Sequence, residues 1–132
     1  GRVRRAFEVD VRQPRAVLDG LDYTYVLGGF SERGRLDEAI FKYDPEGAFV
    51  NRFGSAGDAP GQFRAPHALV VDGRGQIYVS DIKGIQVFGS DGRFIKRLPT
   101  GGSVFGLAFS DRGDLFIIDR NAHQVQKLIL DR

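Results

Sequence analysis

The two histidines are the residues of this chain best suited to carry chemistry. His67 stands at the start of an apolar run, and His123 lies in a loop near the C-terminus. A neutral imidazole can hold a metal ion or act as a general base. In two related stretches of the chain, however, the position of His67 is taken by Arg15 and by Phe105 or Gly106. One chain therefore supplies no histidine cluster of ligand spacing, and we expect no catalytic residue, cofactor or bound metal.

Two aspartates occupy matching positions, because Asp81 and Asp119 each end a short apolar run. Carboxylates arranged in a ring around a channel would suit Ca²⁺. An aspartate at the end of a strand can instead accept hydrogen bonds from the backbone N–H groups of the following turn. Since the residue recurs with the structural unit, we predict that both are structural turn carboxylates. Calcium or zinc binding is the alternative.

The composition excludes several classes of protein. With 19 Lys and Arg against 17 Asp and Glu, the formal net charge is +2, which is too small to imply a nucleic-acid partner by itself. The chain has no cysteine, so it has no disulfide and no thiolate metal site. No apolar run approaches the ~20 residues of a membrane span, and we expect no membrane contact. The composition leaves the cellular compartment open.

The elements that must position these side chains are short strands that recur with a period near 40 residues. In the middle unit they are expected at 68–71, 76–80, 85–88 and 94–98, where β-branched and aromatic residues are separated by turns rich in Gly and Asp. Four strands per unit, with the innermost first, predict a β-propeller blade. Only residues 33–41 carry a pattern that could hold one or two helical turns.

The middle unit resembles the NHL repeat. The resemblance rests on RFGSAGDAPGQF at 52–63, followed by Pro66, Val71-Asp72, Gly75, Ile77 to Asp81 and Val87-Phe88. It covers the middle unit almost throughout and Gly106 to Leu128 well, but the first unit only in its outer half and around Pro14. The resemblance implies an all-β propeller of four-stranded blades, commonly six in a ring. The absence of Trp disfavours WD40 blades, and kelch units would be longer.

The repeats divide the chain into about three blades. We assign residues 1–11 to an outer strand that completes another blade, 12–54 to the first blade, 63–98 to the second, and 103–130 to a third that lacks its own outer strand. Three blades cannot close a ring, because propellers have at least ~4. The chain is therefore expected to be half of a six-bladed propeller. Either a second copy of the chain closes the ring, or other blades from a longer protein do so.

Strand direction sorts the loops onto two faces. The loops that enter each first strand and those that join the second strand to the third share one face, which we expect to be basic. The predicted binding face contains Arg12, Arg15, Phe30, Arg33, Arg35, Leu36, Arg64, His67, Lys83, Arg120, Asn121 and His123. The opposite face is expected to be acidic, with Asp44, Glu46, Asp72, Asp91, Asp111 and Asp114 beside Arg74 and Arg112.

An insertion at residues 28–39 distinguishes the first unit, because it replaces the short connection at 81–84. Extra residues in one loop often carry partner contacts, since the scaffold does not need them. Phe30 and Leu36 are the candidate anchors in this segment. The sequence thus predicts a non-enzymatic propeller scaffold for protein–protein interaction or assembly.

The family resemblance implies two alternative functions. Some NHL-like propellers are metal-dependent lyases or hydrolases with the site at the channel mouth, which would lie near His67. The NHL propellers of animal tripartite-motif proteins bind RNA on a basic face. Against RNA binding, Phe30 and Phe63 are the only aromatic residues expected near that surface, and Phe63 is expected to pack between blades. Glu32, Asp37 and Glu38 also dilute the positive charge of the insertion.

Overall fold

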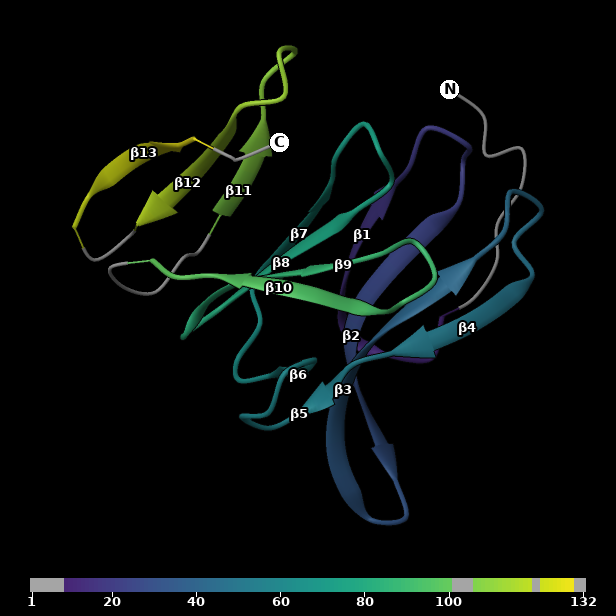
Figure 1. Ribbon diagram of the computed structural model, residues 1–132. Helices are drawn as coiled ribbons and strands as arrows, with labels where there is room; N and C mark the ends of the chain where they lie inside the picture. Colours follow the sequence, from purple (N-terminus) through teal and green to yellow (C-terminus); the bar gives the residue numbers. More distant parts are fainter. Residues whose placement is uncertain (1–8, 101–105, 120–121, 130–132) are drawn as a thin grey trace.

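A computed structural model describes residues 9–100, 106–119 and 122–129 of the 132-residue chain (Figure 1). Over these residues every regular element is a β-strand, which confirms the prediction of an all-β chain. The described strands form three antiparallel sheets and one short parallel pair. Within the same ranges, no helix is long and apolar enough to pass through a membrane.

The first sheet has the strand order β1-β2-β3-β4. Its strands are β1 (Arg12–Leu18), β2 (Thr24–Glu32), β3 (Arg35–Tyr43) and β4 (Phe49–Phe53). An aspartate organises the turn between β1 and β2, because Asp19 Oδ1 accepts hydrogen bonds from the N–H groups of Leu21 and Tyr23 at 2.9 and 3.0 Å. Asp44 serves the turn between β3 and β4 in the same way. Such turns need a short side chain that bonds its own backbone.

The second and third sheets follow along the chain. The second contains β7 (Ala68–Val71), β8 (Ile77–Asp81), β9 (Gly84–Phe88) and β10 (Phe94–Leu98), each within one residue of the strand predicted there. The third contains β11 (Gly106–Phe109), β12 (Leu115–Asp119) and β13 (Gln124–Leu128). The parallel pair of β5 (Ser55–Ala56) and β6 (Gln62–Phe63) lies in the connection between the first two sheets.

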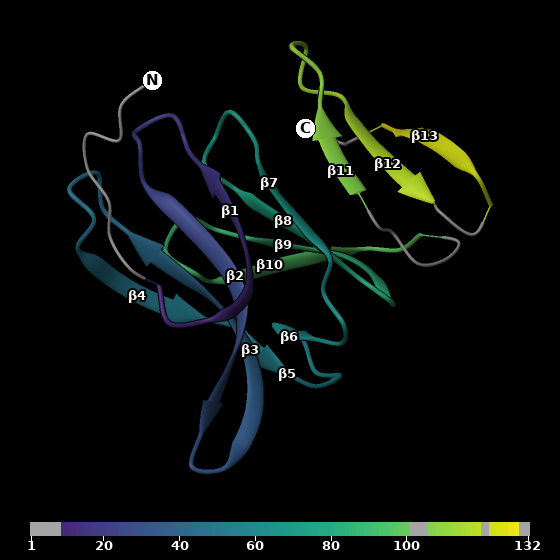
Figure 2. The same cartoon turned by 180° about the vertical axis from the view of Figure 1, so that it is seen from behind.

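Residues 33–41, the one segment with a pattern compatible with helical turns, belong instead to the hairpin of β2 and β3. The hairpin turns at Arg33-Gly34, where φ is 52° and 75°. Two residues of positive φ match the right-handed twist of paired strands. The insertion is thus an extension of two strands rather than an irregular loop, and it projects from the rest of the molecule at the bottom of Figures 1 and 2.

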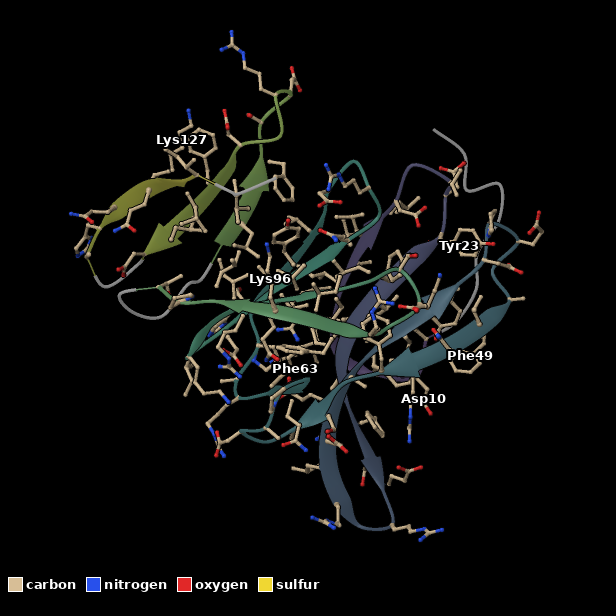
Figure 3. All side chains as sticks on the ribbon, in the orientation of Figure 1. Asp10, Tyr23, Phe49, Phe63, Lys96 and Lys127 are labelled. Atoms are coloured by element: carbon tan, nitrogen blue, oxygen red, sulfur yellow. The ribbon has the colours of Figure 1, made fainter. Side chains whose placement is uncertain are left out.

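An apolar seam joins the first and second sheets. Tyr25, Leu27 and Ile40 of the first sheet and Leu69, Ile77, Val79 and Phe88 of the second are buried together around Phe63. Phe63, labelled in Figure 3, is 1% exposed, and its ring centroid lies 5.6 Å from that of Phe88. Gly54 makes room for it, because a Cβ there would overlap the Phe63 ring. Phe63 therefore packs between two sheets rather than facing solvent.

A second seam joins the second and third sheets. Tyr78, Ile85 and Val87 pack against Leu115 and Ile117, and all five are buried. The first strands of the sheets, β1, β7 and β11, follow one another through space, with β7 in contact with both of the others. Consecutive sheets thus pack face to face with their first strands side by side (Figures 1 and 2). The two seams together join the three sheets, whose strand ends carry the loops.

We expect Phe63→Ala to lower the free energy of unfolding by about 3 kcal/mol, because it creates a cavity in the seam between two sheets. Phe49→Ala is the control, since Phe49 is 58% exposed and its loss should cost about 1 kcal/mol or less. Urea titration followed by circular dichroism measures both values. Equal losses for the two variants would contradict the central position of Phe63.

Candidate functional site

A hollow of roughly 730 Å³ opens between the first two sheets, at the ends where the chain enters β1 and β7. Arg12 and Arg15 of β1, Leu36 and Glu38 of β3, and His67 line it. We call it the Arg12–His67 hollow. It brings together four of the residues predicted for the binding face, namely Arg12, Arg15, Leu36 and His67.

A bulge in β1 places both arginines on the same side of the sheet. Arg12 pairs with Gly29 and Arg15 with Leu27, and the register shifts between the two pairs, where Gln13 has a φ of 50°. Residues three apart in a regular strand point to opposite faces, but a bulge adds one residue and redirects the side chain. Because Gly29 and Leu27 share a face, Arg12 and Arg15 share it too.

The register of the hairpin explains the rest of the lining. Glu38 also pairs with Gly29, so it flanks this glycine opposite Arg12. Leu36 pairs with Ser31, two residues beyond Gly29, and therefore lies on the same face. Gly29 itself has no side chain, which leaves the space between its two neighbours open.

Arg15 links the two sheets across the hollow. Its Nη1 donates a hydrogen bond to the carbonyl oxygen of Pro66 at 3.1 Å, next to His67. Its Nε is buried and has no hydrogen-bond partner among the described residues. Burial raises the pKa of Glu38, and the positive charge of Arg15 partly offsets that rise. The hollow thus contains a guanidinium with an unused donor beside a partly desolvated carboxyl group.

The second carboxylate of the hollow is occupied by backbone groups. Asp37 Oδ1 accepts hydrogen bonds from the N–H groups of Glu38 at 2.8 Å and of Ala56 at 2.6 Å. It thereby fastens the connection after β4 to the edge of β3. In the part of the chain that the structure describes, no three His, Asp or Glu side chains are grouped closely enough to hold a metal ion.

Arg64 and Lys83 lie apart from the hollow and share one carboxylate. Arg64 donates Nε and Nη2 to the two oxygens of Asp58 at 2.8 and 2.7 Å, and Lys83 Nζ approaches Asp58 Oδ1 at 3.3 Å. Hydrogen bonds to these cations lower the pKa of Asp58 to about 2. The sequence analysis did not single out Asp58, which sits in the turn before Pro60. Its ion pairs leave the predicted basic face less positive than its residue types suggested.

The remaining predicted residues are dispersed. Arg33 and Arg35 lie at the exposed end of the β2–β3 hairpin, and His123 is exposed in the turn between β12 and β13. Phe30 faces the other side of the first sheet, where it packs edge-on against Phe41 at 5.5 Å and under the Arg52 guanidinium at 4.9 Å. Phe30 is therefore not part of the hollow. Arg120 and Asn121 lie outside the described residues.

Asp81 and Asp119 bond to backbone groups near the turns that follow them. Asp81 is buried, and its Oδ1 accepts a hydrogen bond from Lys83 N–H at 2.8 Å while its Oδ2 accepts one from Arg64 N–H at 3.1 Å. Asp119 Oδ1 accepts one from Ala122 N–H at 3.0 Å. Asp81 therefore bonds both to the turn after β8 and to the connection that leads to His67.

Buried Gln86 provides a further link that the sequence analysis missed. Its Oε1 accepts a hydrogen bond from Gly61 N–H at 2.9 Å, and its Nε2 donates one to the Gln62 carbonyl at 2.7 Å. The sequence feature that could have indicated this role is that the glutamine recurs, since Gln126 stands at the matching position in the third unit. Gln126 is exposed, so repetition alone did not reveal the role.

Comparison with known proteins shows similarity to propeller folds. A protein of unknown function from Bacteroides caccae superposes with a TM-score of 0.63 at 16% identity, over 88% of this chain and 41% of that one. A gluconolactonase from Xanthomonas campestris superposes with a TM-score of 0.55 at 27% identity, over 83% and 35%. Both structures are β-propeller-like. The chain has a propeller-like fold.

Sequence comparison gives relatives that contain NHL repeats. The chain is 31% identical over 101 residues to peptidyl-glycine alpha-amidating monooxygenase A of Xenopus laevis, and 36% identical over 80 residues to the B-box type zinc finger protein ncl-1 of Caenorhabditis elegans. These matches cover 68% and 52% of this chain but 11% and 9% of the relatives, so the chain spans about a tenth of their length. No family model matches the chain.

We expect Asp81→Ala to destabilise the chain by about 2 kcal/mol, because it leaves two backbone N–H groups without their acceptor. Asp119→Ala is the matched variant from the next repeat, where one N–H group loses its acceptor at an exposed turn, and its cost should be below about 1 kcal/mol. Urea unfolding of both variants measures the difference. Asp119→Ala being the more costly substitution would contradict this account of the two carboxylates.

Proposed function

We propose that the chain is a non-enzymatic NHL-repeat propeller scaffold that binds or assembles with other proteins through the Arg12–His67 hollow and the β2–β3 hairpin. The NHL repeats of its curated relatives and the propeller-like fold support this proposal. A propeller supplies a rigid base on which loops of one face can form a contact surface.

The observation that carries the proposal is the position of Leu36. It is 69% exposed, and it stands on the rim of the hollow beside basic residues of β1. Interfaces commonly combine a central apolar anchor with a polar rim, and arginine is enriched in both parts. The projecting hairpin adds Arg33 and Arg35 at its end, where a partner seated on Leu36 would meet them.

A further part of the proposal concerns completion of the ring. The third sheet ends at β13, and no fourth strand lies outside it among the described residues. Its outer face exposes Ile118 and Val125, which pair across β12 and β13. We propose that further blades cover this face, supplied by a second copy of the chain or by other blades of a longer protein. Native mass spectrometry of the purified chain distinguishes these sources, because only the first doubles the mass.

We expect Leu36→Asp to weaken binding to protein partners at least about tenfold, because a charge would be buried at the anchor of the interface. Leu21→Asp is the control. Leu21 is 75% exposed in the β1–β2 turn of the same sheet, so the substitution has the same chemistry away from the hollow. Affinity capture from cell extract identifies proteins retained by the wild type, and titration calorimetry with a purified partner then measures each variant.

Two results would contradict the proposal. One is partners that bind Leu36→Asp as tightly as they bind wild type. The other is turnover of a sugar lactone that is lost in His67→Ala, which would favour the hydrolase alternative suggested by the name of the similar gluconolactonase. Circular dichroism of each variant shows that a loss of binding is not a loss of fold.

A further inference from the structure

A second hollow lies at the opposite ends of the strands, between the β7–β8 turn and the β11–β12 turn. Its volume is roughly 560 Å³. Both turns stand at the same end of their sheets, at the top of Figure 1. We call this hollow the Arg74–Arg112 groove, after one residue from each turn. The sequence analysis expected this face to be acidic, but the groove has a different character.

Repetition brings two arginines to the groove. Arg74 and Arg112 occupy the same position in consecutive repeats, and their turns close with equivalent hydrogen bonds. Gly75 N–H donates to the Asp72 carbonyl at 3.1 Å, and Gly113 N–H donates to the Ser110 carbonyl at 2.9 Å. Because the turns match, each sheet places its arginine at the same end of its strands.

A third cation, Lys96 of β10, also lines the groove and is labelled in Figure 3. Arg74 and Lys96 are both exposed. Among the described residues, neither forms an ion pair. Their charges are thus available to a ligand that enters the groove from solvent.

The carboxylates of these turns are mostly occupied within the chain. Asp72 Oδ1 accepts hydrogen bonds from the N–H groups of Arg74 and Gln76, both at 2.9 Å, and its Oδ2 accepts one from the Tyr78 hydroxyl at 3.3 Å. In the next repeat the position of Asp72 is taken by neutral Ser110, whose Oγ accepts a hydrogen bond from Asp114 N–H at 3.2 Å.

The two acids between β11 and β12 differ in how they are placed. Asp114 forms an ion pair with Lys127 at 3.4 Å. Asp111 lines the groove and is exposed. The rim therefore carries Arg74 and Lys96, which form no ion pair among the described residues, beside Arg112, whereas its two carboxylates are exposed Asp111 and hydrogen-bonded Asp72. Cations outnumber carboxylates on the rim, so an anionic ligand complements it.

The floor of the groove is apolar. Tyr78 is 4% exposed and meets Phe109 edge-on, with ring centroids 5.1 Å apart. Val71 and Ile95 complete the floor. An apolar floor with a cationic rim suits a chain segment that presents an apolar side chain between carboxylates.

We propose that the Arg74–Arg112 groove binds an acidic peptide segment of a partner protein, with an apolar side chain on the floor and carboxylates at Arg74, Lys96 and Arg112. Single-stranded RNA fits the groove less well, because base stacking needs exposed aromatic faces, whereas the Tyr78 ring is buried and packed edge-on against Phe109. The groove shares no residue with the Arg12–His67 hollow. The peptide proposal for this groove and the proposed function of the Arg12–His67 hollow can therefore be tested independently.

The test uses the 132-residue chain and a fluorescein-labelled peptide of alternating Glu and Leu, followed by fluorescence anisotropy. Comparison probes are the same peptide with Gln in place of Glu, and a labelled single-stranded oligouridine. We expect the acidic peptide to bind, the Gln peptide to bind at least about tenfold more weakly, and added salt to weaken the acidic complex.

Charge reversal at the rim locates the site. We expect Arg74→Glu and Arg112→Glu each to weaken binding of the acidic peptide about tenfold. Arg93→Glu is the control, because Arg93 is exposed on the β9–β10 turn of the second sheet and does not line the groove. It changes the net charge equally and should shift the affinity by less than about twofold.

Three outcomes would overturn the proposal. They are an acidic peptide that does not bind wild type, an equal loss of affinity in Arg93→Glu, and oligouridine binding that exceeds peptide binding and is lost in Arg74→Glu. The last would identify a nucleic-acid surface in place of a peptide groove. Circular dichroism confirms that each variant keeps its sheets, so a weakened affinity reports on the rim.

Discussion

The burial of Phe63 between the first two sheets is the interaction on which the rest of the structure depends. Its ring packs on Phe88 and fits against Gly54, so it fixes the path of the chain between β4 and β7. The same segment then delivers Pro66 to the Arg15 guanidinium. This packing, together with the direct contact between β1 and β7, sets the separation of the two sheets at the Arg12–His67 hollow.

Buried polar groups make this connection specific. Gln86 and Asp81 are both buried. The Gln86 side chain forms hydrogen bonds with backbone groups of residues 61–62, and Asp81 accepts hydrogen bonds from the backbone N–H of residue 64 and from the turn after β8. A buried amide or carboxylate without a hydrogen-bond partner would reduce stability. Residues 61–64 therefore favour the one backbone arrangement that provides partners for both Gln86 and Asp81. Burial of the apolar seam favours association of the two sheets, and these hydrogen bonds fix how residues 61–64 align with the second sheet.

The electrostatic character of each face follows from how its carboxylates are used. Asp19, Asp44 and Asp72 direct their oxygens at turn N–H groups, and Asp58 is held by two cations. Counting residue types on a face therefore does not give the local distribution of charge at either end of the strands. The end expected to be basic has Arg64 and Lys83 paired, and the end expected to be acidic contains the cationic rim of the Arg74–Arg112 groove.

The sequence predicted the strands of the second sheet because their apolar runs and Gly-rich turns are local signals. It treated residues 28–39 as a loop insertion and left one or two helical turns open at 33–41, because a single sequence does not show which residues pair across strands. In the fold, Gly28 is required by the Val11 side chain, which would collide with a Cβ there, and pairing between β2 and β3 overrides the local preference. The bulge that aligns Arg12 with Arg15 depends on cross-strand register, which one sequence does not reveal.

The central claim is that residues 61–64 are locked onto the second sheet and thereby shape the hollow. Amide hydrogen exchange measured by NMR tests it most directly. The account predicts that the amides of Gly61 and Arg64, which donate to buried Gln86 and Asp81, exchange as slowly as those of β8. Exchange of both amides as fast as that of an exposed turn residue such as Ser90 would contradict the account.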